Sequence, residues 1–327
     1  VTIDGFTDLT VIGNGDTTVV EMIDSPVFND GGAGTRDRAA VISVLNSENV
    51  VVQDIKVDGR GLANQLPSGT RVDLIGVLFT DSSGSLEDST VVGARDPLNL
   101  DGTVSGNQRG NAVIVLNTDG SDRTVSILNN EVFDYQKNGI TADGEGLTVN
   151  IDNNIVTGNG LINRSNAQAQ NGIQVAGGAG GSISDNVISE IGQPRNDFAS
   201  SYILAFGAEP GLQITGNTLN GTSDPGFTFG IAAVDTDDLN ILNNNFDRLL
   251  YGLYLVGNVD NPVVSGNDFT NMIASFTPLV GGSNPEVFAT DDLTGLHSFV
   301  DGSSNDFALS YTGTDGTDFI IGSDFDD

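Results

Sequence analysis

Positively charged and amide side chains gather in a few long segments of an otherwise acidic chain. The sequence has 12 Lys and Arg residues against 44 Asp and Glu residues, so a local group of cations changes the potential of one surface. Guanidinium groups bind carboxylates through paired hydrogen bonds, and amides donate to hydroxyl groups. This chemistry suits an anionic polysaccharide. The residues that we assign to substrate binding are Gln136, Arg95, Arg109, Arg164, Gln168, Gln170 and Arg195.

Lys137 and Tyr135 are the members of this group that could transfer a proton. A cation or amide that neutralises a uronate carboxylate lowers the pKa of the proton at C5. A base then removes that proton, and the 4-linked oxygen leaves. Lys137 would be the base if neighbouring arginines or burial lower its pKa. Tyr135 would be the acid or an alternative base, so both are assigned as catalytic residues of a β-elimination.

The same side chains also have a structural interpretation. Most Arg and Lys side chains in a chain with 44 carboxylates form surface ion pairs, which contribute little to stability. Long loops are rich in polar residues in any protein. The binding interpretation therefore requires a fold that brings these distant segments together.

An asparagine recurs at one position of a repeating unit and indicates what that fold is. The steps between successive positions are 24, 32, 31, 27 and 23 residues. Units of this length form solenoids, in which each unit buries its apolar face against its neighbours. The recurring residues, each three positions after an Ile or Val, are Asn130, Asn154, Asn186, Asn217, Asn244 and Asn267.

Short runs with alternating apolar and polar residues fill each unit and predict strands. Strands without helices are also typical of sandwiches and barrels, but here equivalent positions recur once per three strands. Asn side chains stacked about 4.8 Å apart can hydrogen-bond along the stack, and Asn tolerates the left-handed backbone of a sharp turn. We therefore predict an all-β fold, a parallel β-helix solenoid of about ten coils.

Extra residues fall at one point of the unit, after its third strand. Loops inserted at one angular position stack into a wall on one side of a solenoid. The short connection 133–139 interrupts that wall, which predicts a notch with Tyr135, Gln136 and Lys137 on its floor. Loops 93–110 and 157–170 would flank it. The long connections are 58–73, 93–110, 157–170, 190–201 and 220–228.

The composition limits the classes of partner that this protein can bind. A net charge of −32 excludes nucleic acid and anionic membranes as general partners. No run of about 18 apolar residues predicts membrane insertion, and without cysteine there is neither disulfide nor thiolate chemistry. Val1 begins within a strand pattern, so we expect an excised domain that lacks its N-terminal cap. We expect it to be a monomer.

The C-terminal part departs from the repeat. We place the β-helix domain at 1–289 and an exit or cap segment at 290–311. The tail 312–327, Thr-Gly-Thr-Asp-Gly-Thr-Asp-Phe-Ile-Ile-Gly-Ser-Asp-Phe-Asp-Asp, resembles the start of an RTX calcium-binding array. This resemblance implies a longer secreted parent and calcium ligands at Asp315 and Asp318. A flexible acidic tail is the alternative.

The solenoid as a whole resembles right-handed β-helix proteins of the pectin-lyase-like superfamily. The opening 1–15 and the phrases Tyr-Gln-Lys-Asn-Gly-Ile at 135–140 and Ala-Gln-Asn-Gly-Ile-Gln at 169–174 carry the resemblance. It implies a right-handed β-helix, and a Lys or Arg base, often with calcium as the neutralising ion. The candidate calcium ligands are then Asp134, Asp96 and Asp101.

Sharper motifs of this superfamily are missing. Asn-Thr-Asp at 117–119 matches one motif of polygalacturonases, but their paired aspartates, Gly-His-Gly and Arg-x-Lys are absent. Mannuronan epimerases carry a Tyr-Gly-Phe-Asp-Pro-His motif, whereas Tyr135 is followed by Gln-Lys. The single histidine, His297, excludes a Ser-His-Asp triad in the solenoid and a zinc site with several histidines.

Two functions remain open. The first is a secreted, extracellular enzyme, a polysaccharide lyase or related uronate-modifying enzyme that uses calcium. The second is a non-catalytic adhesin or module that binds glycans or only spans distance. The absence of Trp and an aromatic content of 6% favour the second, because aromatic rings are what sugars stack on. The clustered cations favour the first.

Overall fold

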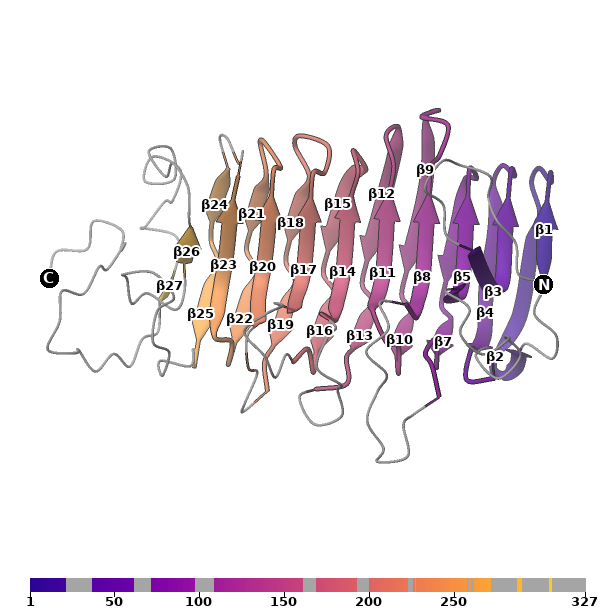
Figure 1. The fold of residues 1–327 in the computed structure, drawn as a ribbon, viewed down its shortest axis with the longest axis horizontal. Helices are drawn as coiled ribbons and strands as arrows, with labels where there is room; N and C mark the ends of the chain where they lie inside the picture. Colours follow the sequence, from indigo (N-terminus) through magenta and orange to yellow (C-terminus); the bar gives the residue numbers. More distant parts are fainter. Residues whose placement is uncertain are drawn as a thin grey trace, which may run out of the picture.

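The computed structural model describes residues 1–21, 37–61, 72–97, 109–160, 169–192, 200–222, 226, 228–257, 259, 262–271, 287–289 and 306–307. Every regular element within these ranges is a β-strand, and none of the described residues forms a helix able to cross a bilayer. Figure 1 shows the strands stacked coil after coil along one long axis. The prediction of an all-β solenoid is confirmed.

One sheet contains a single strand from each coil, and neighbouring strands pair in parallel. Its ten strands agree with the predicted number of coils. In order they are β1 (Thr2–Asp4), β3 (Asp37–Leu45), β5 (Val72–Thr80), β8 (Asn111–Leu116), β11 (Asn138–Asp143), β14 (Asn171–Ala176), β17 (Ser200–Phe206), β20 (Thr228–Val234), β23 (Tyr251–Val256) and β26 (Val287–Ala289).

The second sheet has 17 strands and contains the other two sides of each coil. Long early strands bend around both sides, and later coils divide into a strand before and a strand after the turn. These strands are β2 (Thr10–Glu21), β4 (Val50–Asp58), β6 (Gly84–Glu87), β7 (Thr90–Val92), β9 (Arg123–Leu128), β10 (Glu131–Phe133), β12 (Leu147–Asp152), β13 (Ile155–Thr157), β15 (Gly180–Ser184), β16 (Val187–Ser189), β18 (Gln213–Thr215), β19 (Thr218–Asn220), β21 (Asn240–Leu242), β22 (Asn245–Asp247), β24 (Val263–Ser265), β25 (Asp268–Thr270) and β27 (Asp306–Phe307).

The six recurring asparagines form a continuous buried ladder, as predicted. Each is at most 2% exposed. From Asn130 to Asn267, each Nδ2 donates to the Oδ1 of the next Asn at 2.9–3.0 Å. That Oδ1 also accepts the backbone NH of the preceding Asn. The ladder therefore satisfies backbone groups that the turn would otherwise leave buried without partners.

The left-handed backbone conformation lies at the residue before each ladder asparagine, and not at the asparagine itself as the sequence predicted. The residue before each ladder position has a positive φ, for example 56° at Asn153, 52° at Asp185 and 69° at Gly216. The ladder asparagines themselves are not among the residues with positive φ. Asn, Asp and Gly share the turn position because they tolerate this conformation, whereas the ladder position requires an amide side chain.

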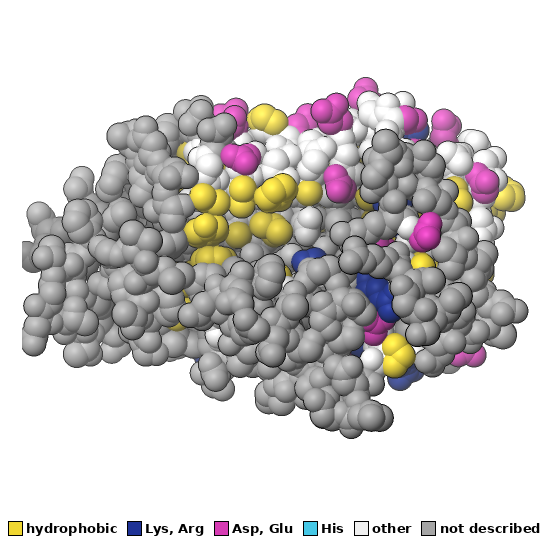
Figure 2. Space-filling view, in the orientation of Figure 1, with side chains coloured by type: hydrophobic (Ala, Val, Ile, Leu, Met, Phe, Trp, Pro, Cys, Tyr) yellow, Lys and Arg dark blue, Asp and Glu magenta, His cyan; other side chains and the backbone are white. Residues whose placement is uncertain are grey.

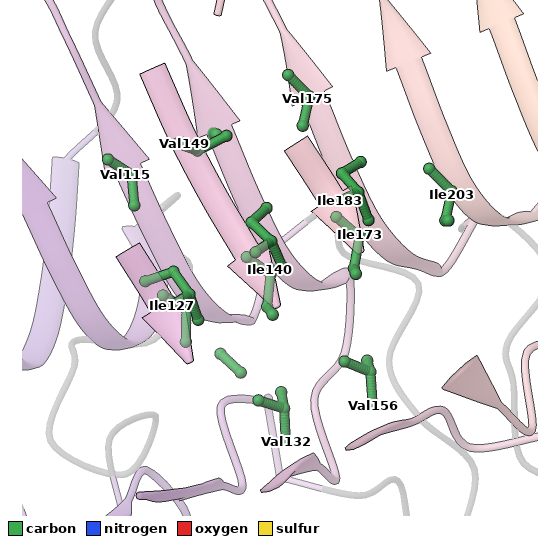
Figure 3. Close-up of a cluster of buried hydrophobic side chains, with 14 of the residues drawn as sticks. Val115, Ile127, Val132, Ile140, Val149, Val156, Ile173, Val175, Ile183 and Ile203 are labelled. Carbon is green, nitrogen blue, oxygen red and sulfur yellow. The ribbon is translucent and has the colours of Figure 1, made fainter. Parts of the chain in front are cut away.

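Aliphatic side chains fill the space between the sheets. Ile140, Ile173 and Ile203 occupy one register position of successive strands, are fully buried and point into the core in Figure 3. Phe246 stacks on Phe269 in the same core, with centroids 4.5 Å apart. Because like side chains stack in register, each coil is stabilised by contacts with the coils on either side.

The five predicted long connections each join a strand of the 17-stranded sheet to the next strand of the ten-stranded sheet, and the connection 22–36 between β2 and β3, also long, was not predicted. Two connections are short. Residues 134–137 join β10 to β11, and residues 248–250 join β22 to β23. We predicted the first and missed the second. Residues 98–108 and 161–168 lie outside the described ranges, so the notch between these loops stays a prediction.

The C-terminal domain boundaries fall mostly outside the described residues. Strand β27 lies within the segment assigned as an exit or cap, and its backbone pairs in parallel with β25. The RTX-like tail, including Asp315 and Asp318, is not described, so its assignment stays a prediction.

Candidate functional site

The short connection between β10 and β11 carries Tyr135, Gln136 and Lys137, but it presents them differently from the prediction. Tyr135 is fully buried and belongs to the hydrophobic core. Its main-chain carbonyl accepts hydrogen bonds from Asn159 Nδ2 (2.7 Å) and Gln170 Nε2 (2.8 Å). The prediction that its side chain lines an open floor is wrong, because an aromatic ring at this point fills the core.

Gln136 is also buried, at 1% exposure, and does not face a ligand. Its Oε1 accepts the backbone NH of Asp96 at 2.8 Å. Its backbone NH donates to Ala94 O and Gly110 O, both at 3.1 Å. The amide thus ties this turn to the preceding coil, which contradicts a substrate-binding role for its side chain.

Two arginines of the predicted cationic site are paired with two of the aspartates assigned to calcium. Arg95 Nε donates to Asp134 Oδ1 at 2.6 Å, and the Arg109 guanidinium forms an ion pair with Asp96. The Asp96 side chain is 4% exposed and that of Arg109 is 18% exposed. Paired charges offer an anionic ligand little net attraction, which favours the structural interpretation of both arginines.

Lys137 is half-buried, and its Nζ donates to the main-chain oxygen of Ala169 at 3.2 Å. Gln170 is 1% exposed. Its Oε1 accepts the backbone NH of Asn159 at 3.0 Å, and its Nε2 is the donor to Tyr135 described above. Gln170 therefore joins two coils instead of facing a sugar, and the substrate-binding assignment is wrong for its side chain.

The described residues contain no metal site of the predicted kind, and several of the assigned residues lie outside them. Across the described ranges, no three His, Cys, Asp or Glu side chains come together as metal ligands would. The carboxylates of Asp96 and Asp134 each contact a guanidinium group. A positive group at this position disfavours a calcium ion, which requires several oxygen ligands. Outside the described residues lie Arg164, Gln168, Arg195, Asp101, Asp315 and Asp318.

A second region, the outward face of the ten-stranded sheet, carries three rows of aligned side chains. The row nearest the loops changes from Asn111, Asn138 and Asn171 to Ser201, Phe229 and Tyr251 along the solenoid. Asn171 Nδ2 donates to Asn138 Oδ1 at 3.1 Å, and Asn171 Oδ1 accepts the backbone NH of Ser201 at 3.0 Å. This is a second amide row, outside the core.

The other two rows make the same change in chemistry. In the middle row, Thr141 and Gln174 are followed by Leu204, Ala232 and Tyr254. Gln174 Oε1 accepts a hydrogen bond from Asn138 Nδ2 at 3.1 Å. The third row, in strand order, is Asp143, Ala176, Phe206, Val234 and Val256.

The apolar part of this face contains aromatic rings. Phe229 stacks on Tyr254 with centroids 4.3 Å apart and 15° between the planes. Phe206 is 53% exposed. Figure 2 shows the hydrophobic side chains gathered over β17, β20 and β23. We call Leu204, Phe206, Val234, Tyr254 and Val256 the apolar strip.

Two charged groups on the ten-stranded sheet, Arg38 of β3 and Asp143 of β11, have shifted pKa values. Burial lowers the pKa of Arg38, and the nearby carboxylates of Asp73 and Asp143 oppose the shift. Burial raises the pKa of the Asp143 carboxyl, and the charge of Arg38 opposes that shift. Each charge is thus partly desolvated and partly compensated by the other.

Sequence reasoning missed this face although a signal was present. The Asn-Gly pairs at 138–139 and 171–172 mark the start of strands, and Phe229 and Tyr251 follow at the same register. Their alignment becomes visible only once connections of unequal length have been removed from the comparison. The count of aromatic residues also hid their concentration in one place.

The comparisons with known proteins define the class. The chain belongs to the family described as right-handed β-helix region, whose model matches residues 111–288, more than half of its length. This confirms the right-handed β-helix. No curated protein sequence matches the chain.

Two solved structures resemble this chain. The GH136 lacto-N-biosidase from Eubacterium ramulus is 10% identical over 82% of this chain and 59% of that one, with a TM-score of 0.39. The Dettilon tailspike protein is 11% identical over 93% of this chain and 63% of that one, with a TM-score of 0.27. The chain spans about three-fifths of the length of these structures, and the likeness concerns the fold.

Proposed function

We propose that this protein is an extracellular carbohydrate-binding β-helix that holds a polysaccharide on the outward face of its ten-stranded sheet. The observation that carries the proposal is the partly exposed amide of Gln174 beside the apolar strip on that face, in a row supported by the buried amides of Asn138 and Asn171. Sugars present hydroxyl groups at their edges and C–H groups on their ring faces, so they need both kinds of partner. Binding sites combine apolar surface with a few placed polar groups in this way.

Charge and burial favour binding over catalysis at the short connection. A lyase needs a base that reaches C5 of the sugar and a group that neutralises the carboxylate. Tyr135 is enclosed in the core, and Arg95 and Arg109 are engaged by aspartates. Lys137 is left as the candidate base for the lyase version of the proposal, with calcium as the neutralising ion.

One experiment tests both versions. The protein is titrated calorimetrically with neutral and uronate-containing polysaccharides, with and without calcium, while absorbance follows any unsaturated uronate product. We expect binding without product. Failure to bind any glycan on a broad panel would overturn the proposal.

A lysine pair provides the control for catalysis. If product forms, Lys137→Ala should abolish it, whereas Lys56→Ala, which removes the one other lysine, on β4 two coils away, should not. Product that depends on Lys137 would replace the binding proposal with the lyase. Circular dichroism would show that both variants keep the β-helix.

A further inference from the structure

Resting on the proposed function, we infer that the ligand is a neutral glycan whose sugar rings stack on the apolar strip, with Phe206 as the principal contact. The strip occupies one end of the outward face, over β17, β20 and β23 (Figure 2). The inference replaces the anionic polysaccharide expected from the sequence with an uncharged one.

Exposure singles out Phe206 within the strip. It is 53% exposed, and its counterpart on the next strand is the half-buried Val234. A single exposed apolar side chain is ordinary, but Phe206 adjoins the other residues of the apolar strip, and contiguous apolar patches mark binding sites. The ring is also rigid, so covering it costs little conformational entropy.

The aromatic neighbours hold the strip in place before any ligand arrives. Tyr254 is half-buried and lies flat on Phe229, which is 4% exposed. Phe229 also contacts Tyr251, with centroids 5.2 Å apart. A preformed surface loses less entropy on binding than a flexible one, and Tyr254 adds a hydroxyl group next to the stacking surface.

Hydrogen-bonding groups adjoin the strip on one side. Gln174 occupies the same register as Leu204 on the neighbouring strand, and its Oε1 accepts from Asn138. Among the described residues its Nε2 donates no hydrogen bond, so this group can donate to a sugar hydroxyl. A glycan lying along the solenoid axis would therefore meet an amide donor first and a stacking surface next.

Charge decides the class of glycan. The three strands β17, β20 and β23 contain no charged residue, and the chain as a whole carries −32. The arginine predicted to attract a carboxylate near this sheet, Arg109, is paired with Asp96. An anionic chain would thus be repelled at long range without local compensation. The same repulsion opposes a second copy of this protein or an anionic membrane on the strip.

The test is a calorimetric titration with neutral glucans, galactans, xylans and mannans, and with alginate and polygalacturonate as anionic counterparts. Phe206→Ala is expected to weaken neutral-glycan binding at least about tenfold, as truncation of a central aromatic contact does. Phe6→Ala is the matched control, because Phe6 is 50% exposed on the first coil. It should leave the affinity unchanged within about twofold.

Other results of these titrations would overturn the stacking site, the neutral class of glycan or the proposed function. Binding to neutral glycans that survives Phe206→Ala and Tyr254→Ala would overturn the stacking site but leave the proposed function intact. A preference for alginate or polygalacturonate would overturn the neutral class. Binding to no glycan would overturn both. A dimer in analytical ultracentrifugation that Phe206→Ala dissociates would show that the strip is a self-association surface, contrary to the inference.

Discussion

Two rows of asparagine run along this molecule, and they differ in how strictly the residue is maintained. The inner ladder keeps Asn in six successive coils with one set of hydrogen bonds. The outer row has Asn at β8, β11 and β14 and then becomes Ser201, Phe229 and Tyr251. The inner position must satisfy buried backbone groups in each of these coils. The outer position can change along the axis, and it is there that the surface acquires different chemistry.

The largest expected effect tests the inner row. Asn186→Ala removes the acceptor of the Asn154 backbone NH and the donor to Ile151 O at 2.9 Å. Two or more buried polar groups lose their partners, so the free energy of unfolding should fall by about 3–5 kcal/mol. Urea denaturation measures this. A loss below about 1 kcal/mol would mean that the ladder does not hold the coils together.

The next largest effect tests whether burial of an ion pair determines how much stability is lost when its arginine is removed. Arg109→Ala leaves the buried Asp96 carboxylate without its guanidinium. We expect a loss of about 2–3 kcal/mol, at or below the usual cost of breaking a buried ion pair because Arg109 is partly exposed. Arg60→Ala is the control. Arg60 pairs with Asp58 but is 56% exposed, so its removal should cost less than about 1 kcal/mol.

A smaller effect is expected for the outer row itself. Asn171→Ala removes the acceptor of the Ser201 backbone NH and the donor to Asn138. We expect about 1–2 kcal/mol of destabilisation, clearly less than for Asn186→Ala in the same urea titration. Equal losses in the two variants would contradict the distinction between a fixed inner row and a variable outer row.

The smallest effect concerns the charge on the outward face. Burial raises the pKa of Asp143, so its ionised form destabilises the folded state above that pKa. This penalty disappears as the pH falls below the ordinary Asp value of about 4. Asp143→Asn should therefore raise the free energy of unfolding at pH 8 by less than about 1 kcal/mol after solvent screening, which would be measured as a higher Tm. The difference should shrink towards pH 4. A lower Tm at pH 8 would show that attraction to Arg38 outweighs burial.

The fold was more predictable than the site. The ladder residues, the strands around them and the position of the long connections follow from the repeat, because each depends on contacts between adjacent coils. The roles of Tyr135, Gln136 and Gln170 were mispredicted. A short polar connection suggests exposure, yet these side chains turn inward to fill the core or to bond main-chain groups.

By itself, the sequence determined the parallel β-helix, its approximate number of coils and the buried ladder, since alternation and a repeated amide specify what each coil places against the next. The right-handed sense was implied by the family resemblance. Only the tertiary structure decided which carboxylate each arginine meets and which outward side chains align. Asp134 is 39 residues from Arg95, and Phe229 and Tyr254 are separated by a whole coil. Such neighbours depend on the register of connections of unequal length. The register of the strands depends on the packing of the whole core, so it cannot be inferred from any single segment of the sequence.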